Sequence, residues 1–211
     1  MNPKPLRHVD LYNDAGRLEA LYRELQDPVG VAVVCHPLPS GGGTLHSKVV
    51  FRAARGLEAA NFATIRFNFR GVGASGGKWD GGEGEQNDVL AALQWITRKH
   101  PGVKVLVGGF SFGAWVASRA ACEQPEVDGI FLIGTPVDKY DFSYLRACDK
   151  PMLFLHGTRD EYGNVEKLEK LVGKLSNSES MILTGADHFF TKQLDAVEET
   201  LRNWAMEIAE Q

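Results

Sequence analysis

Short apolar segments alternate with longer segments in which apolar residues recur every three or four positions. The short runs, such as Gly30–Cys35 and Val103–Phe110, are apolar throughout and predict strands that are buried on both faces. The longer segments predict amphipathic helices. In the segment 48–60 the apolar positions share one helix face, and they are Val49, Val50, Ala53, Ala54 and Leu57. Strands that alternate with helices in this way predict an α/β fold, with a mostly parallel sheet and helices on both faces.

The same pattern predicts the order of the elements. Residues 6–25 alternate as two antiparallel edge strands around a turn at Asn13–Gly16. With 211 residues, 44% of them hydrophobic, the chain can bury a proper core, and we expect a single domain over 1–211. The expected strands are 30–35, 63–69, 103–110, 128–133, 151–156 and 180–183, and the expected helices are 48–60, 85–100, 114–123, 165–175 and 193–210.

The strand at 103–110 ends in Gly109-Phe110-Ser111-Phe112-Gly113, and a helical segment follows at once. A G-x-S-x-G sequence between a buried strand and a helix is typical of a nucleophile elbow, a turn tight enough to strain the serine backbone. The small residues on either side avoid clashes with the neighbouring strand and helix. The following helix N-terminus favours a developing anion. Ser111 is therefore the predicted nucleophile.

A serine nucleophile needs a base and a carboxylate that orients the base, which follow the serine in the order Asp or Glu, then His. Asp160 follows the predicted strand 151–156, and His188 follows the last predicted strand. Both therefore lie on loops at the carboxyl edge of a parallel sheet, where such folds build their sites. We favour Asp160 as the orienting group over the other nearby carboxylates, which are Asp138, Asp141, Glu161 and Asp187.

An oxyanion hole needs two backbone N–H donors. One should be the amide of Phe112, the residue after the nucleophile. The other should come from the loop after Gly30–Cys35, which reads HPLPSGGGT. Because proline has no N–H, Leu38 is the best candidate and Ser40 the second.

The chain resembles a known family in three of its segments. It is similar to small, lidless α/β-hydrolases of the dienelactone hydrolase-like group, through residues 36–50 (HPLPSGGGTLHSKVV), 66–88 (RFNFRGVGASGGKWDGGEGEQND) and 185–190 (GADHFF). The group usually has a second histidine where this chain has Leu38, and dienelactone hydrolases proper have a cysteine where it has Ser111. The resemblance implies a three-layer α/β-hydrolase fold and hydrolysis of acyl esters without a cofactor, but it does not carry over the lactone substrate.

Composition and charge limit the partners and the cellular location that we expect. A net charge of −4 and a pI near 5.9 argue against a nucleic-acid surface or an anchor to anionic membranes. The first ten residues hold no apolar signal segment, and no apolar run is long enough to span a bilayer. Cys35, Cys122 and Cys148 are odd in number and widely spaced, which fits reduced thiols. We expect a cytoplasmic protein with no nucleic-acid or membrane partner, and a homodimer is compatible with the sequence.

Residues 134–150 are all that separates two predicted strands at the place where many lipases insert a helical cap. This length allows a loop with a turn or two of helix, but no cap domain. The site should therefore be open and should take small, soluble acyl substrates. The expected walls, each of which ordinary packing would explain as well, are Leu38, Leu45, Trp79, Tyr140, Tyr144, Phe189 and Phe190.

Several polar residues have structural explanations. Arg70 could bind a substrate carboxylate, but we favour a tie to backbone carbonyls or to Asp80, Glu83 or Asp88. His36 and His156 end buried strands and should hydrogen-bond loop backbone, whereas His46 could face either the cleft or solvent. The histidines show neither i, i+4 spacing nor C-x-x-C partners, so we expect no metal site.

The sequence favours a serine hydrolase that cleaves carboxylic esters through an acyl-enzyme on Ser111. The same groups also cleave thioesters and amides, so a thioesterase or peptidase is one alternative. A non-catalytic member of the fold that binds a small molecule or a partner is another. A nucleotide-binding domain would need a phosphate loop, but no Gly-Lys-Ser/Thr follows the glycines at 41–43 and no G-x-G-x-x-G opens a helix.

Overall fold

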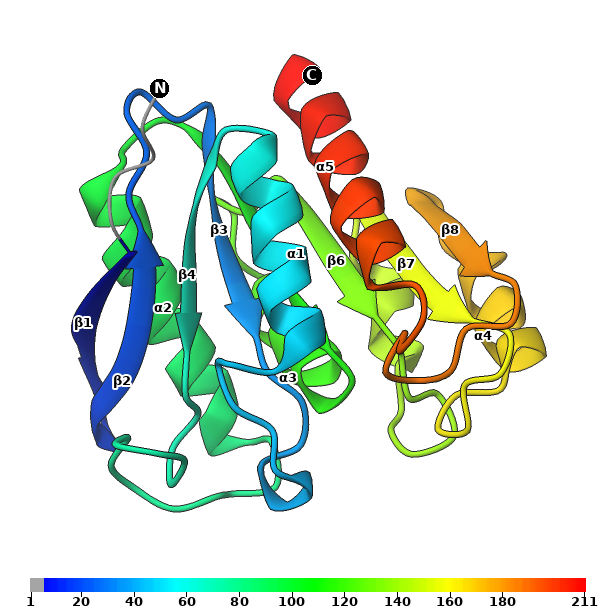
Figure 1. The fold of residues 1–211 in the computed structure, drawn as a ribbon, viewed down its shortest axis with the longest axis horizontal. Coiled ribbons are helices and arrows are strands. Elements are labelled where there is room, and N and C mark those ends of the chain that lie inside the picture. Colours follow the sequence, from blue (N-terminus) through cyan, green and yellow to red (C-terminus); the bar gives the residue numbers. More distant parts are fainter. Residues whose placement is uncertain (1–5) are drawn as a thin grey trace.

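Eight strands form one sheet in the computed structural model, which describes residues 6–211 (Figure 1). The strand order is β1-β2-β4-β3-β5-β6-β7-β8. β2 runs antiparallel to both β1 and β4, and all other neighbouring strands are parallel. The predicted edge hairpin and mostly parallel sheet are therefore confirmed. The strands are β1 (Leu6–Asn13), β2 (Gly16–Arg23), β3 (Gly30–Cys35), β4 (Phe62–Phe67), β5 (Lys104–Phe110), β6 (Gly129–Ile133), β7 (Met152–Gly157) and β8 (Ser178–Leu183).

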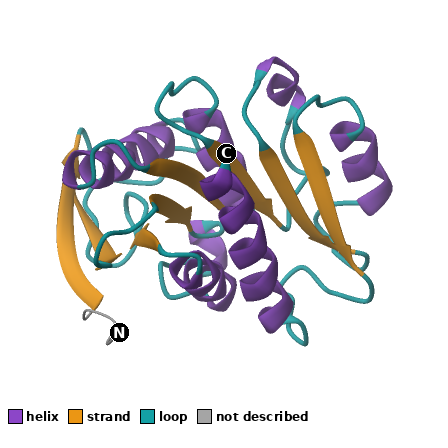
Figure 2. Cartoon of the chain, turned by 90° about the horizontal axis from the view of Figure 1, so that it is seen from above, coloured by secondary structure: helices purple, strands orange, loops and turns teal. Residues whose placement is uncertain are grey.

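The helices lie on both faces of the sheet and make three layers. α1 and α5 pack side by side on one face, and α2, α3 and α4 cover the other (Figures 1 and 2). The predicted apolar face of α1 is buried as expected, against the sheet and α5. The helices are α1 (Lys48–Ala59), α2 (Gly84–Lys99), α3 (Phe112–Ala121), α4 (Val165–Val172) and α5 (Leu194–Glu210), with 3-10 turns η1 (Pro39–Gly41) and η2 (Ser143–Ala147).

Several element boundaries differ from the prediction, and tertiary contacts explain two of the differences. The strand expected at 63–69 ends at Phe67, since Asn68 turns aside: its side chain accepts from the Leu45 N–H at 2.9 Å and donates to Glu19 at 2.7 Å. The last strand begins at Ser178, where it pairs with Met152. Its residues are mostly exposed or half-buried, so their hydrophobic pattern is weak.

In the part of the chain that the structure describes, no cap covers the carboxyl edge of the sheet. The segment between β6 and β7 contains only the short turn η2, as its length predicts. Within residues 6–211, no helix is both long enough and apolar enough to cross a membrane.

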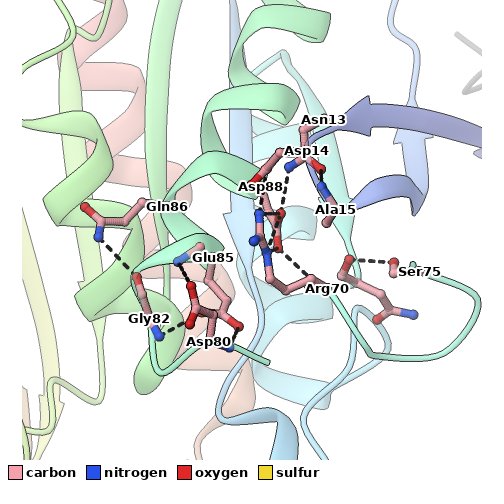
Figure 3. A network of polar contacts seen from close by, with 12 residues as sticks. Asn13, Asp14, Ala15, Arg70, Ser75, Asp80, Gly82, Glu85, Gln86 and Asp88 are labelled. Carbon is pink, nitrogen blue, oxygen red and sulfur yellow. Dashed lines mark hydrogen bonds and ion pairs between the residues drawn. The ribbon is translucent and has the colours of Figure 1, made fainter. Parts of the chain in front are cut away.

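A buried ion pair joins three separate parts of the fold (Figure 3). The Arg70 guanidinium donates to Asp88 of α2 at 2.8 Å and to Asp14, in the turn between β1 and β2, at 3.0 Å. The Arg70 backbone N–H also donates to Asp88 at 2.8 Å, and Asn13 donates to the same carboxylate at 2.7 Å. Burial opposes the charged form, but the hydrogen bonds to Asp88 and Asp14 raise the pKa of Arg70 above its ordinary value. Arg70 is therefore the structural tie that the sequence favours, with Asp88 as its buried partner.

Removing the buried partner should cost far more than removing the exposed one. Asp88→Ala leaves the Arg70 charge buried without its main partner, so we expect the free energy of unfolding to fall by about 3–5 kcal/mol. The matched control Asp14→Ala removes an exposed partner of the same arginine and should cost at most about 1 kcal/mol. Urea unfolding of both variants measures the difference. Equal losses of unfolding free energy in the two variants would contradict the assignment of Asp88 as the main partner of Arg70.

Candidate active site

Ser111 lies in the sharp turn between β5 and α3, as the G-x-S-x-G sequence predicts. Its backbone has φ 56° and ψ −120°, a conformation that costs a non-glycine residue about 1–3 kcal/mol. The Ser111 N–H donates to the Ile133 carbonyl at 2.8 Å, and its carbonyl accepts from Ala114 at 2.9 Å. These bonds hold the strained turn in place.

Two glycines allow the turn at Ser111 to lie close to the end of β3. A Cβ atom on Gly113 would lie 2.4 Å from the His36 carbonyl oxygen, and one on Gly109 would lie 2.7 Å from the Cys35 carbonyl oxygen. Both obstacles are backbone atoms, which cannot rotate away. The glycines are therefore required by the close approach of α3 to β3.

His188 joins Ser111 to Asp160 through two hydrogen bonds. Its Nε2 atom lies 3.0 Å from the Ser111 Oγ, and its Nδ1 atom lies 2.7 Å from Asp160 Oδ2. Because a carboxylate can only accept, Nδ1 carries the proton and Nε2 is free to accept from the serine hydroxyl. The other Asp160 oxygen accepts the N–H groups of Tyr162 at 2.8 Å and Gly163 at 3.1 Å. Asp160 thus holds His188 in the tautomer that a general base needs.

Three of the other nearby carboxylates have different partners. Asp138 accepts from the Asn164 N–H and pairs with Lys167, and Asp141 bonds to Ser143. Asp187 accepts the Thr191 N–H at 2.9 Å, which turns its carboxylate away from the neighbouring histidine. Of the carboxylates weighed from the sequence, the structure brings Asp160 to His188.

The predicted oxyanion donors, Phe112 and Leu38, both line the space next to Ser111. Phe112 is the first residue of α3, so its N–H has no partner within the helix. The Leu38 carbonyl accepts from Gly41 and Gly43, each at 3.1 Å, which fixes the orientation of this part of the loop. Among residues 6–211 neither amide donates to another protein group.

His36 fixes the base of the same loop. Its Nε2 accepts the Phe69 N–H at 3.0 Å, so Nδ1 carries the proton and donates to the Pro37 carbonyl at 2.7 Å. Burial lowers the pKa of His36 to about 4, and the bond to Pro37 offsets this only in part. His36 is therefore neutral at physiological pH, and it bonds loop backbone as predicted.

His156 supports the turn that carries Asp160. Its Nε2–H donates to the Gly163 carbonyl at 2.7 Å, and the Gly163 N–H donates to Asp160. The His156 Nδ1 atom is buried 3.8 Å from Asp160 Oδ2 and has no hydrogen-bond partner among the described residues. Across residues 6–211 the structure forms no cluster of three or more His, Cys, Asp or Glu side chains suited to a metal.

A cavity of about 400 Å³ opens directly on Ser111 and His188. Its walls are mostly apolar and include three of the residues proposed from the sequence, Leu38, Tyr140 and Phe189. The Tyr140 ring stacks on the Trp115 indole with 4.3 Å between ring centroids, which holds this wall rigid. The cavity is suited to a small, largely apolar group.

Four expected wall residues lie elsewhere. Leu45 is fully buried, and Arg66 donates to its carbonyl at 2.9 Å, so it packs beneath the loop. Trp79 is 53% exposed on the glycine-rich loop and does not line the cavity. The Tyr144 hydroxyl bonds to Ser118 at 2.8 Å, and Phe190 is buried in the core between the sheet, α1 and α5. Leu45 and Trp79, which the sequence analysis proposed as substrate-binding residues, therefore do not line the cavity at Ser111.

The cavity is also lined by residues that the sequence analysis did not propose, among them Pro136, Lys139 and Tyr162. Pro136 and Lys139 follow β6 on the same loop as Tyr140, and Tyr162 is two residues after Asp160. The Tyr162 ring lies against that of His188, with 4.5 Å between centroids. Their position on loops at the carboxyl edge of the sheet was the signal that could have found them.

Fold and site together define the class. Residues 34–211 match the family model of the alpha/beta hydrolase domain, so the chain belongs to the α/β-hydrolase family. An uncharacterized protein of Rickettsia prowazekii is 37% identical over 204 residues, which are 92% of this chain and 86% of the relative.

Two solved structures of serine hydrolases are similar over almost their full length. A serine hydrolase without a lid from Xanthomonas campestris is 31% identical, with a TM-score of 0.87 over 96% of this chain and 94% of its own. An alpha-beta serine hydrolase homologue from Coxiella burnetii is 32% identical, with a TM-score of 0.88 over 93% of this chain and 96% of its own. The predicted lidless α/β-hydrolase fold is confirmed.

The elbow geometry leads to a stability prediction. In Gly113→Ala the new methyl group would meet backbone oxygens, so we expect the free energy of unfolding to fall by about 1–3 kcal/mol. In the matched control Gly41→Ala the nearest atom to the new methyl is 4.0 Å away, so stability should change by less than about 0.5 kcal/mol. Urea unfolding measures both. A Gly113→Ala protein as stable as the control would show that α3 can move away from β3.

Proposed function

We propose that this hydrolase cleaves carboxylic esters of small, soluble substrates through an acyl-enzyme on Ser111. The observation that supports the proposal is the hydrogen-bonded line from Ser111 through His188 to Asp160, with distances of 3.0 and 2.7 Å, at the edge of an apolar cavity. These distances are within the reach that proton transfer needs.

In the proposed mechanism the Ser111 Oγ attacks the ester carbonyl carbon while His188 Nε2 takes the hydroxyl proton. The carbonyl oxygen becomes an anion that the N–H groups of Phe112 and Leu38 stabilise. When the intermediate collapses, the bond to the alcohol oxygen breaks and His188 gives its proton to that oxygen. Asp160 stabilises the imidazolium throughout.

The second half of the cycle uses the same groups. A water molecule gives a proton to His188 and attacks the acyl-enzyme carbonyl. The bond to Oγ then breaks, the carboxylic acid leaves, and Ser111 recovers its proton from His188. The open edge and the limited cavity volume favour small acyl esters over long lipid chains. Comparing kcat/KM for matched esters, thioesters and amides of one acyl group tests the alternatives of a thioesterase or a peptidase.

Labelling with a fluorophosphonate tests the nucleophile. We expect one adduct on Ser111, none on the Ser111→Ala protein and slow labelling of His188→Ala, because the probe reacts only with an activated serine hydroxyl. Either substitution should lower kcat for ester hydrolysis on the order of 10⁶-fold if the three groups act as a unit. Mass spectrometry locates the adduct. Failure to label folded wild-type protein would favour the binding-protein alternative.

The role of Asp160 has a separate test. In Asp160→Asn the amide can donate to His188 and favours the wrong tautomer, so kcat should fall on the order of 10⁴-fold. The matched control Asp187→Asn changes the adjacent carboxylate, which faces Thr191 instead, and should leave kcat within about twofold. Steady-state kinetics with one ester compares the two. Similar kcat values for both variants would exclude Asp160 as the orienting group.

A further inference from the structure

A second cavity, of about 320 Å³, lies beside the one that opens on Ser111. The two cavities share three wall residues, Pro37, Gly41 and Phe189. Phe189 follows His188 in the chain and its ring is perpendicular to the imidazole, with 5.2 Å between centroids and an interplanar angle of 85°. Phe189 therefore borders both spaces and packs against the His188 imidazole.

The two cavities lie over opposite layers of the fold. The first is built on the α3 side, with Phe112, Tyr140 and Pro136 in its walls. The second reaches over the other layer, where Val49 of α1 and Leu194 of α5 line it. Because the nucleophile lies at the sheet edge between these layers, a substrate that extends both ways from the reacting carbon would occupy both.

Their walls differ in chemistry. The first cavity is mostly apolar around the serine. The second has an apolar floor, but its polar side chains include Ser47, Lys48 and Thr191, and no carboxylate lines it. Lys48 is exposed and makes no ion pair with any residue in the range 6–211. This set of groups can donate hydrogen bonds to hydroxyl or anionic oxygens, and its charged side chain, Lys48, repels a cation.

An ester has two parts, and the proton transfer decides which part faces His188. The leaving alcohol oxygen must reach His188 Nε2 to receive its proton, so the alcohol leaves the reacting centre alongside the imidazole. The His188 imidazole lines the first cavity, and Phe189, which packs against it, lines both cavities, so an alcohol that leaves past Phe189 would enter the second. The acyl group then remains in the apolar cavity at Ser111.

We infer that the second cavity is the subsite for the leaving group, and that Phe189 separates it from the acyl subsite. The substrates would be esters of a small apolar acid with an alcohol that carries hydroxyl groups or a negative charge. This inference rests on the proposed esterase function and extends it to the substrate class.

Butyrate esters of ethanol, glycerol, glycerol 3-phosphate and choline test the inference with one acyl group. We expect higher kcat/KM for the glycerol and glycerol phosphate esters than for the choline ester. Lys48→Ala should lower the ratio of kcat/KM for the glycerol phosphate ester to that for the ethyl ester about two- to fivefold, the size of an exposed ion pair. Phe189→Ala should make the kcat/KM values of the four butyrate esters more alike. Equal values for all four esters in the wild-type protein would overturn the inference.

Lys139 supplies a matched control, because it lines the first cavity as Lys48 lines the second. Lys139→Ala should leave unchanged the ratio of kcat/KM for the glycerol phosphate ester to that for the ethyl ester. Monoethyl succinate places the negative charge on the acyl side instead, and its hydrolysis relative to ethyl butyrate should respond to Lys139→Ala and not to Lys48→Ala. The reverse pattern, in which Lys48 affects the succinate ester and Lys139 the glycerol phosphate ester, would overturn the assignment.

Failure of this inference can be distinguished from failure of the proposed function. Fluorophosphonate labelling of Ser111 and hydrolysis of ethyl butyrate report the esterase function alone. If both succeed while the alcohol has no effect on kcat/KM, only the leaving-group subsite is rejected. If both fail, the esterase function itself is rejected.

Discussion

The close contact between α3 and the end of β3 is the constraint on which the site depends. Gly109 and Gly113 allow the elbow to approach the carbonyl oxygens of Cys35 and His36, with no room for a Cβ atom on either glycine. Those carbonyls end β3 and begin the loop that presents Leu38. One contact therefore sets the position of the nucleophile and of one proposed oxyanion donor relative to each other. Strain at Ser111 is the cost of this arrangement, and the bond from its N–H to Ile133 helps to offset it.

The sequence predicted the parts of the site that follow from topology. Asp160 and His188 could be located because each follows a predicted parallel strand, and parallel strands bring their carboxyl ends to one edge. The wall residues could not be predicted in the same way. Leu45 and Trp79 are on loops near that edge, yet one is buried beneath its loop and the other is exposed to solvent. Which way a loop side chain points depends on tertiary contacts, such as the bonds from Asn68 and Arg66 to Leu45, and these have no local pattern.

Buried polar groups in this fold are used mainly to hold loops. Asp88 and Arg70 tie α2 to the turn after β1, while Glu85 accepts the N–H groups of Asp80 and Gly82 and closes the glycine-rich loop (Figure 3). The His36 side chain holds the loop that carries Leu38, the proposed oxyanion donor, through bonds to backbone groups. Because these groups bond one another or the backbone, they stay satisfied without a ligand. That is consistent with a rigid site that needs no cap to assemble it.

The absence of a cap from the described chain has a consequence for specificity. A hydrolase with a cap can enclose its substrate, but here selectivity has to come from the walls at the sheet edge. The edge lies between two helical layers, so an ester bound at Ser111 in the proposed way would have its two parts over different layers. Phe189 lines both spaces and directly follows His188, the proposed base, in the chain. In the proposed function, the residue that separates the two sides of the substrate is thus positioned by the same short loop that positions the base, and changes in this loop would alter catalysis and selectivity together.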